Sequence, residues 1–196
     1  DQYYAHFPSV LIDTFTLYKQ LSKQWCDQNI VSSIRQLVPE RILKLNSHKI
    51  LKPPFQWYKK DFMSWMPKDP QCRSCGMLLN AELIKSGSWK LRETELHTCD
   101  RCGSSKYFLD ISKSPHDAKI RTERCSEWYM LFGAILTSLS FQTRIVHDYL
   151  DDCWNESLID GKWIHLDPTL DYPISFSHPH WYEQNRTKKY EYVMLC

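Results

Sequence analysis

Two closely spaced cysteine pairs constrain the fold of this chain more than any other feature of its sequence. The first pair is Cys72-x-x-Cys75 and the second is Cys99-x-x-Cys102, and each is followed directly by a glycine. Two such knuckles can wrap one tetrahedral metal ion with four thiolates, and the glycines let the backbone turn around the sulfur atoms. We expect a structural zinc site. A redox role is the alternative, and either interpretation indicates a reducing compartment.

The composition is that of a globular chain without a marked charge excess. The chain has 196 residues, of which 42% are hydrophobic and 14% aromatic, enough for one main domain with a core. The formal net charge is +2, so we expect no broad cationic surface for nucleic acid or anionic membranes. No apolar run has the length of a membrane span, and the first residues show no secretory signal pattern.

A further cysteine, Cys125, stands at the start of the most regular helical pattern in the chain. Apolar residues follow it three or four positions apart, which predicts a helix that buries one face. These residues are Trp128, Leu131, Phe132, Ile135, Leu136 and Leu139. The helix dipole and the neighbouring Arg124 favour the thiolate form of such a cysteine. Cys125 is therefore a candidate nucleophile, with a small buried hydrophobic residue as the alternative interpretation.

Alternating segments after this helix predict an antiparallel sheet. They cover residues 143–149, 153–159 and 162–167, and Asp160-Gly161 forms a hairpin turn between the last two. Trp163, His165 and Asp167 then share one face of the third strand. Residues 190–195 predict a closing edge strand. A cysteine-bearing helix followed by a sheet with polar groups can build a thiol-based acyl-transfer site.

The N-terminal half predicts helices and an aromatic-rich segment. Helical spacing over residues 7–25 and 29–37 indicates two helices, whose apolar stripes we interpret as packing or partner-docking faces. Between residues 52 and 70, prolines argue against a plain helix. The aromatic side chains there either cover the zinc lobe, which we favour, or form a wall for a sugar ligand. The lobe itself spans residues 71–105, with a strand at 89–96, and a polar linker at 115–124 follows it.

Taken in order, these motifs resemble the transglutaminase-like core of the cytoplasmic peptide:N-glycanases. The resemblance covers the chain from about Trp57 to its end, and the following residues carry it. They are Trp65, Asp69-Pro70-Gln71-Cys72, the two cysteine knuckles, Arg124-Cys125-Ser126-Glu127-Trp128, Arg144-Ile145-Val146-His147-Asp148-Tyr149, Trp154-Asn155-Glu156 and Trp163-Ile164-His165-Leu166-Asp167. Glycines of the family are replaced here by Glu123, Ser126 and Ser140.

The resemblance implies an α+β fold in which a transglutaminase-like (papain-like) core packs a cysteine-bearing helix on an antiparallel sheet, beside a four-cysteine zinc lobe. We divide the chain into an N-terminal helical region (1–56), an aromatic-rich segment with the zinc-binding lobe (57–110) and the transglutaminase-like core (111–196).

The implied activity is hydrolysis of the amide between an N-linked glycan and asparagine in misfolded glycoproteins. The family uses a Cys-His-Asp triad, in which Cys125 matches the cysteine and Asp167 the aspartate. Where the family reads His-Val-Trp-x-Glu, this chain has Asp152-Cys153-Trp154-Asn155-Glu156, so Asp152 stands at the histidine position. A carboxylate is a weaker base than imidazole and opposes a nearby thiolate, so we expect catalysis to be impaired or lost.

Other site residues follow from the same resemblance. Trp65, Trp154 and Trp163 match aromatic positions near the family's active site and are candidate sugar-stacking residues. His147 or His165 would act as the missing base only if its ring reached Cys125. We favour an inactive site over this alternative.

Three functional hypotheses remain at this point. The first is a deglycosylating hydrolase of the cytoplasm, and also of the nucleus, in ER-associated degradation. The second is a non-catalytic glycoprotein-binding adaptor, a pseudoenzyme linked to the proteasome through a ubiquitin-receptor DNA-repair protein, with Tyr18 and Leu21 on its docking stripe. The third is a DNA-binding relative of the superfamily, which the near-neutral charge disfavours.

Overall fold

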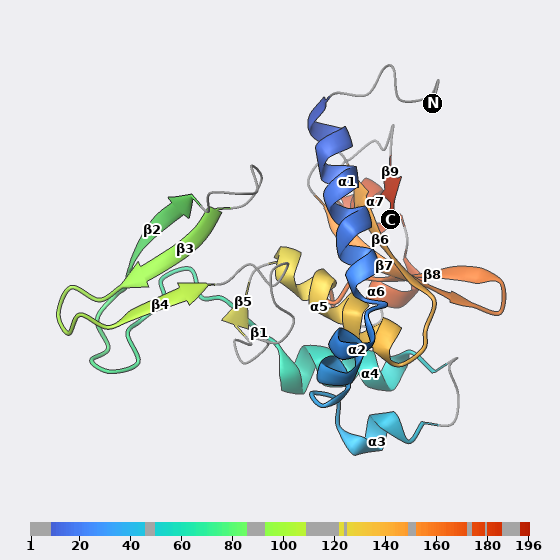
Figure 1. The fold of residues 1–196 in the computed structure, drawn as a ribbon, viewed down its shortest axis with the longest axis horizontal. Coiled ribbons are helices and arrows are strands. Elements are labelled where there is room, and N and C mark those ends of the chain that lie inside the picture. Colours follow the sequence, from blue (N-terminus) through green and yellow to red (C-terminus); the bar gives the residue numbers. More distant parts are fainter. Residues whose placement is uncertain are drawn as a thin grey trace.

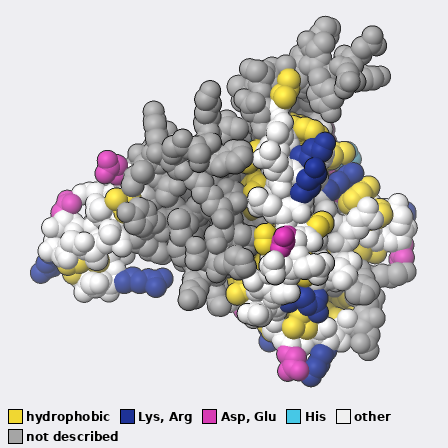
Figure 2. Space-filling model, in the orientation of Figure 1, with side chains coloured by type: hydrophobic (Ala, Val, Ile, Leu, Met, Phe, Trp, Pro, Cys, Tyr) yellow, Lys and Arg dark blue, Asp and Glu magenta, His cyan; other side chains and the backbone are white. Residues whose placement is uncertain are grey.

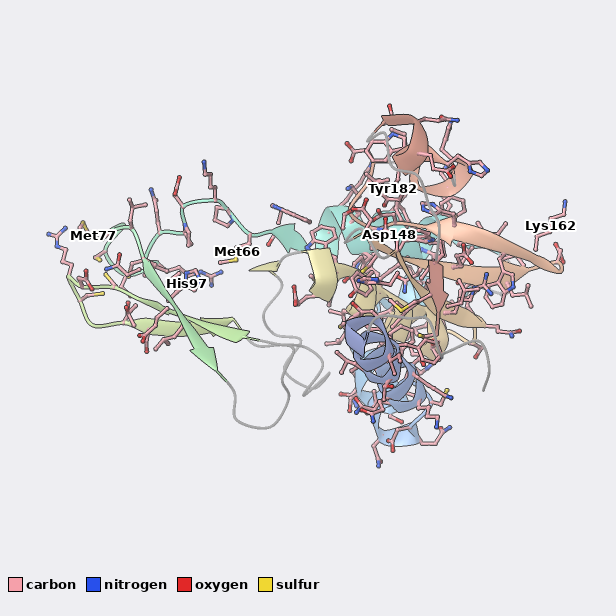
Figure 3. The ribbon with its side chains drawn as sticks, turned by 90° about the horizontal axis from the view of Figure 1, so that it is seen from above. Met66, Met77, His97, Asp148, Lys162 and Tyr182 are labelled. Carbon is pink, nitrogen blue, oxygen red and sulfur yellow. The ribbon has the colours of Figure 1, made fainter. Side chains whose placement is uncertain are left out.

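A computed structural model describes residues 9–45, 50–85, 93–108, 122–123, 125–148, 152–171, 174–178, 180–185 and 193–196. At some of these positions, Cys125 among them, only the backbone is described. A body of helices and one sheet lies at one end, and a three-stranded lobe lies at the other (Figure 1). Figure 3 places Met77 and His97 in the lobe, and Asp148 and Tyr182 in the body.

The two predicted N-terminal helices are present as α1 (Ser9–Gln24) and α2 (Gln28–Arg35), and a short α3 (Glu40–Leu43) follows them. The Asp27 carboxylate caps α2 by accepting two backbone N–H bonds. Tyr18 and Leu21 are only 6% and 5% exposed and lie in the main hydrophobic core. Of the two roles predicted for this apolar stripe, packing and partner docking, Tyr18 and Leu21 take the packing role.

The proline-containing segment is helical, contrary to expectation. It forms α4 (Lys52–Trp57) and continues into a π-helix, η2 (Tyr58–Phe62). The prolines stand in the first turn of α4, where a missing N–H breaks no intrahelical bond. The aromatic side chains of both helices belong to the main core, and the rings of Phe55 and Tyr58 lie 5.6 and 4.9 Å from that of Phe132. The prediction that this aromatic segment covers the zinc lobe is therefore wrong for these residues.

Helix α5 (Cys125–Ser138) begins at the predicted cysteine and runs through the centre of the body (Figure 1). Residues 128–136 are all buried, so this helix is enclosed on every side, not on the one face that its spacing predicts. Its neighbours approach most closely at Gly133. A Cβ atom there would lie 2.3 Å from the Trp25 ring and 2.7 Å from Asn155 Nδ2. Glycine is therefore required where Trp25, just after α1, and the sheet meet α5.

The sheet of the body contains β6 (Thr143–Asp148), β7 (Cys153–Ile159), β8 (Lys162–Leu166) and β9 (Val193–Leu195). The order is β8-β7-β6-β9 and all pairs are antiparallel, which confirms the α+β class. The predicted turn is also present, with positive φ angles at Asp160 and Gly161. Ile145 faces the main core, whereas Val146 packs with Trp154 and Tyr182 on the opposite face. Two short helices, α6 (Ile174–Ser177) and α7 (Trp181–Asn185), follow β8.

The lobe is a three-stranded antiparallel sheet of β2 (Asn80–Lys85), β3 (Glu93–Thr98) and β4 (Ser105–Phe108). The strand expected at 89–96 is found from Glu93, and residues 86–92 lie outside the described ranges. Between lobe and body, β1 (Ser64–Trp65) pairs in parallel with β5 (Thr122–Glu123). Charged side chains of both signs lie on the lobe and on the body in the view of Figure 2.

Ser140 ends α5 in a conformation that suits glycine. Its φ angle is 68°, in the left-handed region. The Ser140 N–H donates to Thr137 O at 2.9 Å, and the Phe141 N–H donates to Leu136 O at 3.0 Å. These two bonds are those of a Schellman motif, in which the left-handed residue is usually glycine.

We expect Ser140→Gly to raise the free energy of unfolding by roughly 0.5–1 kcal/mol. Relief of the left-handed strain exceeds the greater backbone entropy that glycine gives the unfolded chain. Ser140→Ala removes the hydroxyl and keeps the strain, so it serves as the control in thermal or urea denaturation. A glycine variant no more stable than the alanine variant would contradict this explanation.

Candidate functional site

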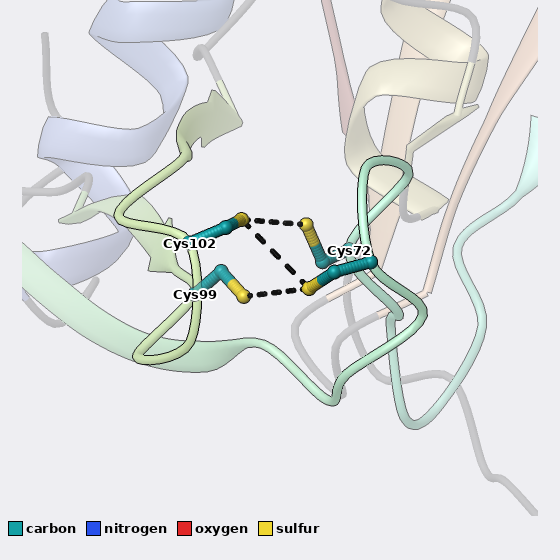
Figure 4. Close-up of side chains that lie close together, drawn as sticks. Cys72, Cys99 and Cys102 are labelled. Atoms are coloured by element: carbon teal, nitrogen blue, oxygen red, sulfur yellow. Dashed lines mark hydrogen bonds between the residues drawn. The ribbon is translucent and has the colours of Figure 1, made fainter.

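The four predicted cysteine ligands lie together in the lobe. Their Sγ atoms are all within 4.8 Å of one another. The Cys72–Cys102, Cys75–Cys99 and Cys75–Cys102 pairs are 3.5, 3.4 and 3.8 Å apart (Figure 4). A tetrahedral site with metal–sulfur bonds of about 2.3 Å requires sulfur separations of roughly 3.8 Å. The donor set and its spacing therefore fit a metal ion.

The two knuckles share one backbone design. In the first, the Cys72 N–H donates to Met77 O at 2.7 Å, and the Gly76 N–H donates to Cys72 O at 2.8 Å. The second repeats both bonds from Cys99 and Gly103, at 2.9 and 2.8 Å. Both glycines have positive φ angles, 73° and 67°. The glycine after each pair thus lets the chain fold back around its sulfur atoms, as predicted.

Hydrogen bonding makes the thiols of the cluster unequal. The Ser104 hydroxyl lies 3.0 Å from Cys72 Sγ and 3.1 Å from Cys102 Sγ, and it lowers the pKa of both thiols, that of Cys72 to about 5. The Met77 N–H lowers the pKa of Cys75, but the adjacent Cys99 thiol and burial outweigh it and raise this pKa to about 12. Protons therefore remain within the cluster at neutral pH, and a divalent cation must displace them to bind four thiolates.

We expect Cys99→Ser to lower the metal affinity of the purified protein by at least tenfold, since even outer-shell changes cost roughly that much. Bound metal should also be lost as the pH falls, because protons compete for the thiolates. Elemental analysis after gel filtration measures both effects. Cys26→Ser, at an exposed cysteine outside the lobe, is the matched control. Full metal content in the Cys99→Ser protein would contradict the four-thiolate site.

The two predicted triad carboxylates border neighbouring strands. Asp152 immediately precedes β7, and Asp167 immediately follows β8. Because Asn155 pairs with Leu166, the same register places Trp154 beside Asp167, and Asp152 faces the same side as Trp154. Asp152 is half-buried. Its N–H donates to Asp148 Oδ1 at 2.7 Å, and its carbonyl accepts the Asp148 N–H at 2.9 Å.

Asp167 is a buried carboxylate with donors on both oxygens. It is 1% exposed. Oδ1 accepts the Thr169 N–H at 2.7 Å and the Thr169 hydroxyl at 2.6 Å. Oδ2 accepts the hydroxyl of Tyr182, from α7. Among the described residues, the donors to this carboxylate are Thr169 and Tyr182, and they stabilise it in its buried position.

The loop after Asp167 lies beside the first turn of α5. Lys59 Nζ donates to Thr169 O at 2.9 Å and also lies 5.9 Å from the centre of the Trp128 ring. Trp128 is in the first turn of the helix that begins at Cys125. The Cys125 side chain lies outside the described part of the chain, so its role as nucleophile stays a prediction.

Trp65, a predicted sugar-contact residue, lies beside the first turn of α5. It is 55% exposed, and its ring centre is 5.7 Å from that of Trp128. Its backbone pairs with Glu123, two residues before Cys125.

The other two tryptophans differ in exposure. Trp163 is 37% exposed, with the Arg144 guanidinium 3.8 Å above its ring. Trp154 is 5% exposed and stacks on Tyr182. The sugar-stacking roles of all three tryptophans stay predictions.

The two histidines considered as replacement bases pack against aromatic rings. The His147 ring lies 5.3 Å from Tyr18, and the His165 ring lies 5.5 Å from Trp154.

Sequence reasoning missed Thr169 and Tyr182 as partners of Asp167. A Thr two residues after an Asp is compatible with an Asx-turn, whereas nothing in the sequence marks Tyr182.

The fold and the cluster define an α+β protein with antiparallel sheets, a lobe whose four cysteines are close enough together to hold a metal ion, and a central helix that begins with cysteine. No helix of the described residues is long and apolar enough to cross a bilayer.

Comparison with known proteins adds relatives that share one name, peptide-N(4)-(N-acetyl-beta-glucosaminyl)asparagine amidase. The chain is 28% identical to the Caenorhabditis briggsae protein over 182 residues, which is 85% of this chain and 30% of that protein. It is 29% identical to the Saccharomyces cerevisiae protein over 156 residues, 74% of this chain and 42% of that protein. It is 30% identical to the Macaca fascicularis protein over 149 residues, which is 70% of this chain and 22% of that protein. No family model matches the chain.

The resemblance to the peptide:N-glycanases is therefore confirmed, because homologues of that name occur across eukaryotes. The chain spans less than half the length of each of these relatives.

We expect Tyr182→Phe to lower the free energy of unfolding by roughly 1–3 kcal/mol, because a buried carboxylate loses a donor. Tyr129→Phe is the matched control. Its hydroxyl meets the neutral Tyr18 hydroxyl at 2.9 Å, so the loss should be smaller, roughly 0.5–1.5 kcal/mol. Urea denaturation compares the two variants. Equal losses would contradict a charge-assisted bond to Asp167.

Proposed function

We propose that the chain is the core of a peptide:N-glycanase-type protein that acts on N-linked glycans of misfolded glycoproteins. Its body would be a transglutaminase-like (papain-like) fold, and its amide hydrolysis would be impaired or lost. One observation carries the proposal: α5 begins at Cys125, and Asp152 and Asp167 border adjacent strands of the neighbouring sheet, on the face that carries Trp154 and Tyr182. This order along the chain is the one that the Cys-His-Asp resemblance implies.

The chemistry of such a site needs a base that works in both directions. The thiol must lose its proton to attack the amide carbon, and the leaving amine must gain one. An imidazole with a pKa near neutrality does both, whereas a carboxylate at position 152 is a poor base and repels a thiolate. Asp167 would orient the base, since both of its oxygens are fixed by Thr169 and Tyr182.

The metal of the lobe would be zinc in a structural role. Four thiolates in tetrahedral spacing are a typical zinc donor set and leave no open position for substrate. We retain the division into residues 1–56, 57–110 and 111–196. The core shared by α1, α2, α4 and α5 supports treating the first and last of these regions as one packed unit.

The alternative function is that of a glycoprotein-binding adaptor without catalysis. It is favoured by the hydrogen bonds that Asp167 accepts from Thr169 and Tyr182, which within the described part of the chain stabilise that carboxylate on both oxygens. In this case the protein would connect glycoproteins to a ubiquitin-receptor DNA-repair protein and the proteasome, in the cytoplasm or nucleus. The docking surface would have to differ from the buried Tyr18 and Leu21.

The Asp152→His variant tests the proposal. We expect release of glycan from a denatured glycoprotein to rise by roughly two to four powers of ten over the native chain, the usual contribution of general acid-base catalysis. Asp152→Asn is the control for charge alone and should remain slow. Cys125→Ala combined with Asp152→His should abolish release.

Two outcomes would count against the proposal. A native chain as active as the Asp152→His variant would contradict the impaired site. Inactivity of both proteins, with folding intact, would favour the adaptor.

A further inference from the structure

The π-helix η2 contacts both parts of the predicted site. Its first residue, Tyr58, is fully buried, and its hydroxyl donates to Trp128 O at 2.7 Å, in the first turn of α5. Its second residue, Lys59, reaches the loop that follows Asp167. Adjacent residues of one short helix therefore hold the start of the cysteine-bearing helix and the aspartate loop.

The Lys59 ammonium group has an acceptor for each of its three donors. Nζ donates to Thr169 O at 2.9 Å and to Pro168 O at 3.4 Å, and Asp171 Oδ1 lies 3.3 Å away. The Lys59 side chain is only 20% exposed, whereas that of Asp171 is 88% exposed. The exposed ion pair contributes little. The bonds to the two partly buried carbonyls are the ones that fix the loop.

A short chain of hydrogen bonds connects Lys59 to Asp167. Thr169 accepts from Lys59 through its carbonyl and donates its N–H and hydroxyl to Asp167 Oδ1. Thr169 therefore cannot shift without moving the donors on that oxygen. The ring of Trp128 lies under the same ammonium group and adds a cation–π contact to α5.

We propose that Lys59 is a positioning residue that sets the location of Asp167 relative to the start of α5, with Tyr58 as its anchor. This rests on the proposed function, since it assigns the position of Asp167 a catalytic consequence once a histidine is present. π-Helical turns are rare and are often found at functional sites, where they redirect a side chain. Here the π-helical turn places Tyr58 against α5 and Lys59 against the loop after Asp167.

The test compares Lys59→Met, Lys59→Arg and Lys60→Met. Methionine keeps an apolar stem of similar length without the charge, arginine keeps the charge, and Lys60 is an exposed neighbour that serves as the control. Each variant is made in the native chain and in the Asp152→His protein. Hydrogen exchange of the Thr169 amide is followed by NMR, with amides of β6 as internal reference, and kcat and KM for glycan release are measured in the histidine background.

In the native background we expect Lys59→Met to accelerate exchange at Thr169 roughly tenfold relative to β6, the effect of one lost hydrogen bond. In the Asp152→His background, kcat should fall roughly tenfold to a hundredfold with little change in KM, as for a misplaced catalytic group. Lys59→Arg should keep both the exchange rate at Thr169 and kcat close to their values with Lys59, and Lys60→Met should change neither.

Equal exchange at Thr169 in the Lys59→Met and Lys60→Met proteins would overturn the positioning role. So would a kcat that Lys59→Met leaves unchanged in an active Asp152→His protein. If Asp152→His releases no glycan, the proposed function fails, and the exchange comparison still decides whether Lys59 holds the loop.

Discussion

Enclosure of α5 is the constraint on which the rest of the body depends. Its residues 128–136 are buried, so every neighbouring element must present an apolar or hydrogen-bonding surface to it. The turn after α1 does so with Trp25, the sheet with Asn155 and η2 with Tyr58. Close packing of this kind tolerates little displacement. The first turn of α5 is held at Trp128 by Tyr58 and Trp65, and this places the backbone at Cys125, three residues earlier.

The second constraint is electrostatic. Asp167 is almost completely buried, and a buried carboxylate is stable only with donors around it. Thr169 and Tyr182 provide them, and Lys59 ties Thr169 to the first turn of α5. The site geometry is thus maintained by residues that have no part in proton transfer. Under the proposed function, these residues would keep the site in place with Asp152 at the position of the base, and this is why a single substitution is proposed to restore turnover.

Sequence analysis predicted the features that depend on local spacing. The four ligands of the lobe, the start of α5 at Cys125, the strands of the main sheet and the Asp160-Gly161 turn all follow from short-range patterns and agree with the structure. The errors concern which surface each element meets. The stripe with Tyr18 and Leu21 allows both packing and partner docking, and the aromatic residues of α4 were predicted to cover the lobe, whereas both groups pack in the main core. Nothing in the spacing of Lys59 or Tyr182 shows that they meet the Asp167 loop, because such contacts arise only when distant segments fold together.

The central claim is that Cys125 lies in a glycan cleft together with Asp152 and Asp167. Mass spectrometry of the folded protein after incubation with a haloacetamidyl chitobiose probe tests it most directly, with the exposed Cys26 as an internal reference for nonspecific alkylation. We predict selective labelling of Cys125 that excess free chitobiose suppresses. Labelling of Cys26 with Cys125 unmodified, or labelling of Cys125 that chitobiose leaves unchanged, would contradict the account.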